Sequence, residues 1–204
     1  MASEPTLNPG DYVTPVPQES DPYGSFGTLY STNVSFGPTL DGLAGNLISS
    51  VITNDASNPW YFSGGLTFTY QILLSPSATN GASEISIGSF AGFLADVNYN
   101  TNMGGMGPFA VQRSGSGQDI RFSFVPELGP SSSSALLVVQ TDGTMWRNDI
   151  ASVLDNSAAA NIPTLVPVPE PASVGLFLLG SAIAARYRRS ALAAFFRRIR
   201  PKKT

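Results

Sequence analysis

The stretch Leu66-Thr67-Phe68-Thr69-Tyr70-Gln71-Ile72-Leu73-Leu74 decides the fold of this chain. Apolar side chains occupy every second position, which is the period of a β-strand with one face in a core. The same alternation recurs in residues 93–99 and 120–124, and residues 47–53 predict a mixed strand. Residues 135–139 are apolar on both faces, as a central strand would be.

Turn-forming residues separate these segments. Clusters of Gly, Asn, Ser and Pro occupy residues 54–59, 75–83, 102–108, 114–118, 126–134 and 142–143, and no helical period appears between residues 26 and 154. Short strands joined by such loops predict an all-β fold, an antiparallel β-sandwich or jelly-roll-like domain over residues 26–154. Residues 1–25 predict an extended N-terminal arm, and the Pro-rich residues 155–171 predict a linker.

Charge divides the chain into two parts. Three basic and fourteen acidic residues give residues 1–170 a net charge of −11, whereas residues 171–204 carry eight cations and no acid. An acidic body repels phosphate backbones, so we expect no nucleic-acid partner. The chain has 204 residues, enough for one main domain with its own core. It has no cysteine and no histidine, which excludes disulfides, Cys/His zinc sites and Ser-His-Asp triads.

The C-terminal segment has three parts. Val168-Pro169-Glu170-Pro171 precedes an uncharged run over residues 172–185, and the cluster Arg186, Arg188 and Arg189 follows. As a helix the run would span roughly 21 Å, short of a hydrocarbon core of about 30 Å unless flanking arginines extend it. The side chains expected in the membrane are Ala172, Val174, Leu176, Phe177, Leu178, Leu179 and Ile183. Basic residues on the C-terminal side predict that this end stays in the cytoplasm and the body lies outside.

This order of motif, apolar helix and arginines resembles the PEP-CTERM sorting tail of bacterial surface and secreted proteins. Residues 64–71, 89–93 and 137–142 are similar to phrases that recur in the β-rich ectodomains preceding such tails. The resemblance implies a membrane-embedded processing enzyme, exosortase, that cuts near Pro-Glu-Pro. It further implies a transient stay in the inner membrane, then the cell surface or extracellular matrix, with membrane lipid and extracellular polysaccharide of a biofilm as partners.

Two other interpretations of the tail are a permanent membrane anchor and a C-terminal core helix of the globular domain. Sorting-tail proteins carry a secretory signal, but residues 1–5 have neither a basic region nor an apolar one. We therefore expect either that the true start lies upstream or that the chain is a mature-like form.

Catalysis without histidine or cysteine would need carboxylates, as in glycosidases. The candidates are Asp55, Glu84, Asp96, Asp119, Glu127, Asp142 and Asp149. Nearly all fall in predicted turns, where Asp serves turn geometry, and Asp96 falls on the polar face of a strand. We expect solvated or turn-forming roles for them and a protein that is not an enzyme.

The sequence of the body contains few motifs that indicate a ligand site. No cofactor is expected; a structural calcium ion would use Asn54 and Asp55, or Asp142, but no calcium loop motif is present. Trp60 and Tyr61 are the candidates for stacking on a sugar ring, the alternative being that Trp60 and Phe62 cap the core. The sequence thus predicts a non-enzymatic exported surface protein. The other hypotheses are a carbohydrate-binding module or carboxylate-based glycoside hydrolase, and a permanently tail-anchored membrane protein.

Overall fold

The computed structural model describes residues 6–17, 27–155 and 158–168 of the 204-residue chain. By its internal contacts the chain divides into two units, Met1–Pro169 and Glu170–Thr204, and all described residues belong to the first.

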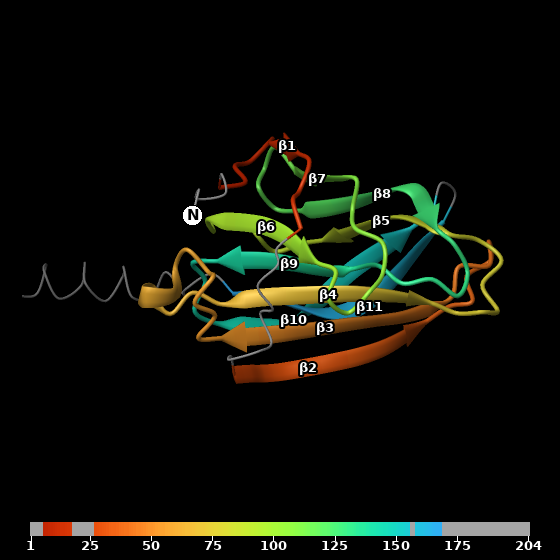
Figure 1. The fold of residues 1–204 in the computed structure, drawn as a ribbon, viewed down its shortest axis with the longest axis horizontal. Coiled ribbons are helices and arrows are strands. Elements are labelled where there is room, and N and C mark those ends of the chain that lie inside the picture. Colours follow the sequence, from red (N-terminus) through yellow and green to blue (C-terminus); the bar gives the residue numbers. More distant parts are fainter. Residues whose placement is uncertain (1–5, 18–26, 156–157, 169–204) are drawn as a thin grey trace, which may run out of the picture. The chain divides into compact units, whose positions relative to one another are not determined.

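Two β-sheets make up the described body, and every ladder between their strands is antiparallel (Figure 1). The six-stranded sheet has the order β1 (Tyr12–Val13), β7 (Ala110–Arg113), β8 (Ile120–Leu128), β5 (Ala82–Ile87), β10 (Trp146–Leu154) and β11 (Ala159–Pro167). The five-stranded sheet has the order β2 (Gly27–Phe36), β3 (Gly45–Thr53), β4 (Thr67–Leu74), β9 (Leu136–Thr141) and β6 (Ala95–Asn100). The one helical turn among the described residues is the 3₁₀ helix η1 (Tyr61–Ser63). The predicted all-β, two-sheet class is confirmed.

The core lies between the two sheets, and β4 fills its centre as the alternation predicts. Phe68, Tyr70 and Ile72 are completely buried in one apolar cluster with side chains of the other sheet, among them Phe122 on β8. The Tyr70 hydroxyl donates a hydrogen bond of 2.7 Å to the carbonyl oxygen of Leu165 on β11. This bond joins the two sheets, because β4 and β11 belong to different ones.

Strand β9 is the central strand that its composition predicts. It lies between β4 and β6, and all six of its residues are buried. Leu137 and Val139 belong to the core cluster, whereas Val138 and Gln140 alternate with them on the other face.

The predicted linker over residues 155–171 is wrong for most of its length. Ala159–Pro167 forms β11, which pairs with β10 in an unbroken register from Leu154↔Ala159 to Trp146↔Pro167. The small residues and prolines of this segment gave it no strand pattern in the sequence. In the structure Ile162, Leu165 and Val166 are buried in the core cluster. Two prolines are tolerated because β11 is an outer strand, where a missing N–H need not break a ladder.

The N-terminal arm is also better ordered than the sequence predicts, at least over residues 6–17. Leu7 is buried, and its amide donates to the Ala95 carbonyl at 2.7 Å. Further along, β1 pairs with β7, and Pro17 forms an isolated bridge with Tyr99 on β6. The arm therefore contacts both sheets, through the buried Leu7, the partly buried Val13 and backbone pairing.

A buried arginine holds the arm in place. Arg113, at the end of β7, is 2% exposed and is the largest fully buried side chain of the body. Its guanidinium donates to the carbonyls of Leu7 (2.7 Å), Phe90 (2.7 Å), Phe93 (2.8 Å) and Gly117 (3.2 Å). Burial lowers the pKa of this group, while the nearby charges of Asp142 and Asp11 act in the opposite direction. One side chain thus ties the arm to two loops.

Candidate functional site

Most of the sequence-predicted site residues lie outside the described part of the chain. These are Pro169, Glu170 and Pro171 of the motif, the membrane-helix residues Ala172, Val174, Leu176, Phe177, Leu178, Leu179 and Ile183, and the cluster Arg186, Arg188 and Arg189. Within the described ranges, no helix is long and apolar enough to cross a membrane.

Val168 is the motif residue that the structure does place. It directly follows β11, and its amide donates to the carbonyl of Met145 at 3.0 Å. The preceding residue, Pro167, is opposite Trp146 at the end of the ladder. The body is therefore hydrogen-bonded to itself up to the residue before Pro-Glu-Pro.

The candidate sugar-stacking residues lie in the loop between β3 and β4. Trp60 precedes η1 and is partly buried, and Tyr61 is the first residue of the helix. Gly64 ends η1 with a φ of 83°, in the left-handed region that favours glycine. Phe62 is 98% exposed, so the alternative in which it caps the core is wrong. The tight turn projects Phe62 outward, which alternation could not reveal because the residue is not in a strand.

The rings of Tyr61 and Phe62 form an edge-to-face pair. Their centroids are 5.1 Å apart and their planes meet at 66°. A sugar ring stacks on a flat aromatic face, and two rings at this angle cannot share one flat platform. The loop therefore offers the exposed ring of Phe62, a residue that the sequence prediction did not select.

Asp55 is a buried carboxylate whose oxygens are already occupied. One oxygen accepts from the Ser57 amide (2.9 Å) and hydroxyl (2.6 Å), and the other from Thr67 (2.6 Å) and Gln140 (3.1 Å). The amide bond two residues on is the turn role that the sequence predicts for Asp. The bonds to β4 and β9 fasten the loop to the five-stranded sheet. In the described residues no group of three or more acidic side chains could hold a metal ion.

Several of the other candidate acids lie on strands, contrary to the prediction of turns. Glu84, Glu127 and Asp149 are on β5, β8 and β10. Asp96 is on β6 as expected, but it is 4% exposed and therefore not solvated. In the ladders each acid that has a partner faces a residue that is not acidic, such as Ser123 opposite Glu84.

Two acids keep turn roles. Asp142 follows β9, and its carboxylate accepts from the Leu94 amide at 2.9 Å. Asp119 lies in the turn before β8, where its amide donates to the Ser114 hydroxyl at 2.9 Å. The first bond joins two loops and the second closes a single turn, and neither involves a second carboxylate.

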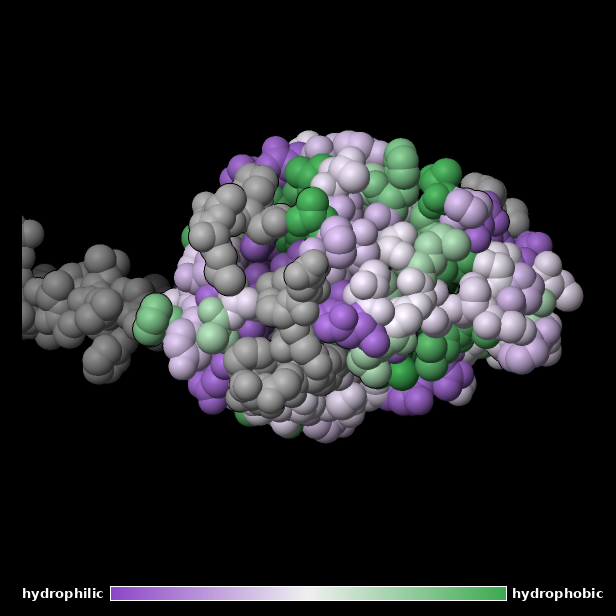
Figure 2. Space-filling view, in the orientation of Figure 1, coloured by the Kyte–Doolittle hydropathy of each residue, from purple (hydrophilic) through white to green (hydrophobic). Residues whose placement is uncertain are grey.

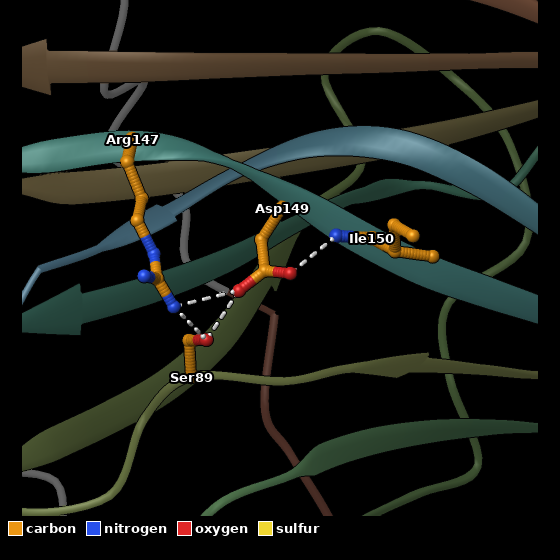
Figure 3. A network of polar contacts seen from close by, with 4 residues as sticks. All are labelled: Ser89, Arg147, Asp149 and Ile150. Carbon is orange, nitrogen blue, oxygen red and sulfur yellow. Dashed lines mark hydrogen bonds and ion pairs between the residues drawn. The ribbon is translucent and has the colours of Figure 1, made fainter.

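A polar cluster that sequence reasoning missed joins β10 to the loop after β5 (Figure 3). The Ser89 hydroxyl donates to Asp149 at 2.5 Å, and Arg147 donates to both the Asp149 carboxylate (3.0 Å) and the Ser89 oxygen (3.1 Å). The Ile150 amide adds a bond of 2.9 Å. Ser89 has a φ of 70°, uncommon for a residue other than glycine. Sixty residues separate Ser89 from Asp149, so no local motif could have signalled the cluster.

The bonds of this cluster hold the loop after β5 to β10. Activating a serine requires a base whose pKa lies near the working pH. The Ser89 bond, together with Arg147 and the Ile150 amide, instead lowers the pKa of Asp149 below its ordinary value, against a smaller opposing effect of burial. Asp149 is therefore a weak base that remains ionised, and the cluster holds loop and strand together.

The geometry defines the body as a two-sheet antiparallel β-domain whose polar side chains fasten loops. Comparison with protein-family models finds no match, and neither the curated proteins nor the solved structures contain a significant match. What the chain does must be inferred from its own residues.

Proposed function

We propose that this chain is a non-enzymatic exported surface or extracellular-matrix protein, delivered by its C-terminal PEP-type sorting signal and processed near Pro169–Pro171. The order of Pro-Glu-Pro, apolar run and arginines supports delivery to the cell surface by the sorting signal. The separation of a −11 body from a tail with eight cations supports its orientation, because cations are retained on the cytoplasmic side.

The place where the body ends carries the proposal. Strand β11 stops at Pro167, and Val168 still bonds to Met145. A cut within residues 169–171 would therefore leave all eleven strands in place. A cut before residue 159 would remove β11 and with it Leu165 and Val166 from the core. The Pro-Glu-Pro motif thus follows directly on the last described residue, which is bonded to the body, and this supports processing there.

The test is the intact mass of the protein from its native host, in membrane and extracellular fractions. We expect an extracellular species ending near Pro169–Pro171, absent when Glu170→Ala is introduced and unchanged by Glu127→Ala, a control at an exposed acid of the body. A full-length chain confined to the inner membrane, indifferent to Glu170→Ala, would refute sorting and establish a permanent anchor.

Glycan binding is a second candidate, because Phe62 presents an exposed ring beside Tyr61. We propose extracellular polysaccharide as the ligand. A glycan array should show binding that is lost in Phe62→Ala and kept in Phe109→Ala, a substitution at an aromatic that is 54% exposed elsewhere on the body. Trp60→Ala tests the stacking role that the sequence predicts for Trp60. Absence of binding to any glycan would end this candidate.

A further inference from the structure

The two sheets have four outer strands, β1 and β11 in one and β2 and β6 in the other. An outer strand carries unpaired backbone N–H and C=O groups along one side, to which another chain can add. Proteins protect such strands by keeping them short, covering them, or placing charges or prolines on them. The four outer strands of this body differ sharply in this respect.

Three of the outer strands are protected within the described body. Strand β1 has two residues. Strand β6 is contacted by the arm, through the bond from Leu7 to Ala95 and the bridge of Pro17 with Tyr99. Strand β11 contains Pro163, which offers no N–H to a further strand.

Apart from a β-bulge near its start, which also discourages pairing, strand β2 has none of these protections. Its ten residues, Gly-Thr-Leu-Tyr-Ser-Thr-Asn-Val-Ser-Phe, include no charge and no proline, and seven of them are exposed. It pairs with β3 on one side, and Figure 1 shows no described strand beyond it. An irregularity between Thr28 and Tyr30 interrupts the register, so the regular part available for pairing begins at Tyr30.

We propose that β2 pairs antiparallel with β2 of a second copy of this chain, around a two-fold axis, joining two five-stranded sheets into one. On a two-fold axis a residue lies opposite its own copy, so a charge at or near the axis would meet a like charge, which is destabilising. Residues 1–170 carry a net charge of −11, so two copies repel each other over most of their surface. An uncharged strand of ten residues is a site where two copies can associate without bringing acidic side chains together. Ser31, Asn33 and Ser35 are exposed at alternate positions, but Ser31 and Asn33 already bond to Ser50 and Asn46 on β3, so the backbone groups of β2 would form the seam.

Figure 2 shows the hydropathy of one face of the described body. On the face that it shows, hydrophobic and hydrophilic residues are interspersed over the described body and do not form one broad apolar patch. Strand addition needs no such patch, because backbone hydrogen bonds supply the affinity. The proposal does not depend on the sorting tail or on its processing.

The chain has no cysteine, which allows a direct test with the full chain in excess detergent. Single cysteines are introduced in turn at residues 30–36 and oxidised. A residue on the two-fold axis lies opposite its own copy with β-carbons about 4.5–5.5 Å apart, close enough for a disulfide to form after a small adjustment. Moving two residues along separates the two copies of that residue by roughly 14 Å. We expect one position to give at least tenfold more disulfide dimer than the positions two residues away.

The control is Asn161→Cys, an exposed position on the proline-containing strand β11, which should give no specific dimer. Lysine is then added to the most reactive variant at Ser31 and Ser35, or at whichever of the two does not carry the cysteine. This should abolish the dimer, whereas Ala159→Lys and Asn161→Lys should not. A flat profile over residues 30–36, or equal reaction at residue 161, would mean that copies meet only through their tails and would overturn the proposal. If a different polypeptide were found bound to β2 in protein purified from the host, without any disulfide, the proposal that a second copy binds there would be overturned.

Discussion

Replacing Arg113 with Met should destabilise the body by about 3–5 kcal/mol. The guanidinium donates to four carbonyls, and a hydrogen bond to a charged group contributes about 1.5–3 kcal/mol. Four bonds at about 1.5 kcal/mol would give roughly 6 kcal/mol. The net loss of stability is smaller than this sum, because Met also removes a buried charge that is costly to desolvate. The remaining 3–5 kcal/mol is about the loss found when a buried ionic contact is broken.

The assay is thermal unfolding of the full chain at a fixed detergent concentration, followed by the fluorescence of Trp60 and Trp146. At about 2–4 °C per kcal/mol for a domain of this size, the midpoint should fall by about 6–20 °C. The matched control is Arg121→Met, since Arg121 is exposed and reaches Glu84 only at 3.9 Å. Exposed contacts of this kind contribute at most about 1 kcal/mol.

A local readout separates this explanation from general damage to the core. Hydrogen exchange of the Leu7 amide, bonded to Ala95, should accelerate in Arg113→Met because the arm loses its anchor. Arg113→Lys should behave similarly, since one ammonium cannot replace a fork that reaches four carbonyls. If Arg113→Met melted with the midpoint of Arg121→Met, and the Leu7 amide stayed protected, the assigned role of the arginine would be refuted.

Three further predictions concern single groups. Burial raises the pKa of Tyr70 well above its ordinary value, so the protonated hydroxyl contributes its full stabilisation below about pH 10, and this stabilisation is lost as the pH rises further. Tyr70→Phe should lower the stability by about 1 kcal/mol at pH 7 and should reduce the loss of stability that the wild type shows above about pH 10. The bond from Ser89 lowers the pKa of Asp149 in the folded state. The stabilisation by the ionised carboxylate is therefore complete above the unfolded-state pKa of about 3.9 and is lost as the pH falls through the folded-state pKa. Asp149→Asn should therefore weaken the acid dependence of unfolding below about pH 4, and an unchanged acid limb would contradict the network in Figure 3. Gly105 has a φ of 93° and a β-carbon there would overlap a backbone carbonyl, so Gly105→Ala should lower stability by at least about 1 kcal/mol, whereas Gly115→Ala, in open space, should change it by less than about 0.5 kcal/mol in urea unfolding.

The sequence alone determined the class of the fold and the strands with clear alternation. In β4, and in β8 from Ile120 to Phe124, every second residue is apolar and buried, as the period of two predicts. The sequence did not reveal that the polar residues between them in β4 are buried as well. The central position of β9 was likewise predictable, because both of its faces are covered. The sorting hypothesis also came from sequence, since the order of motif, apolar run and arginines is local. It remains a proposal, because those residues lie outside the described ranges.

Only the tertiary structure decided which weakly patterned segments join the body. Residues 159–167 resemble a linker, yet pairing with β10 makes them a strand, because the ladder depends on a partner and not on local composition. The four carbonyls around Arg113 and the contact of Ser89 with Asp149 join residues that are far apart in sequence. The absence of protection on β2 is visible only once the strand order is known. Periodicity reports which side of a segment is buried, whereas neighbours across a sheet or a loop are fixed by packing alone.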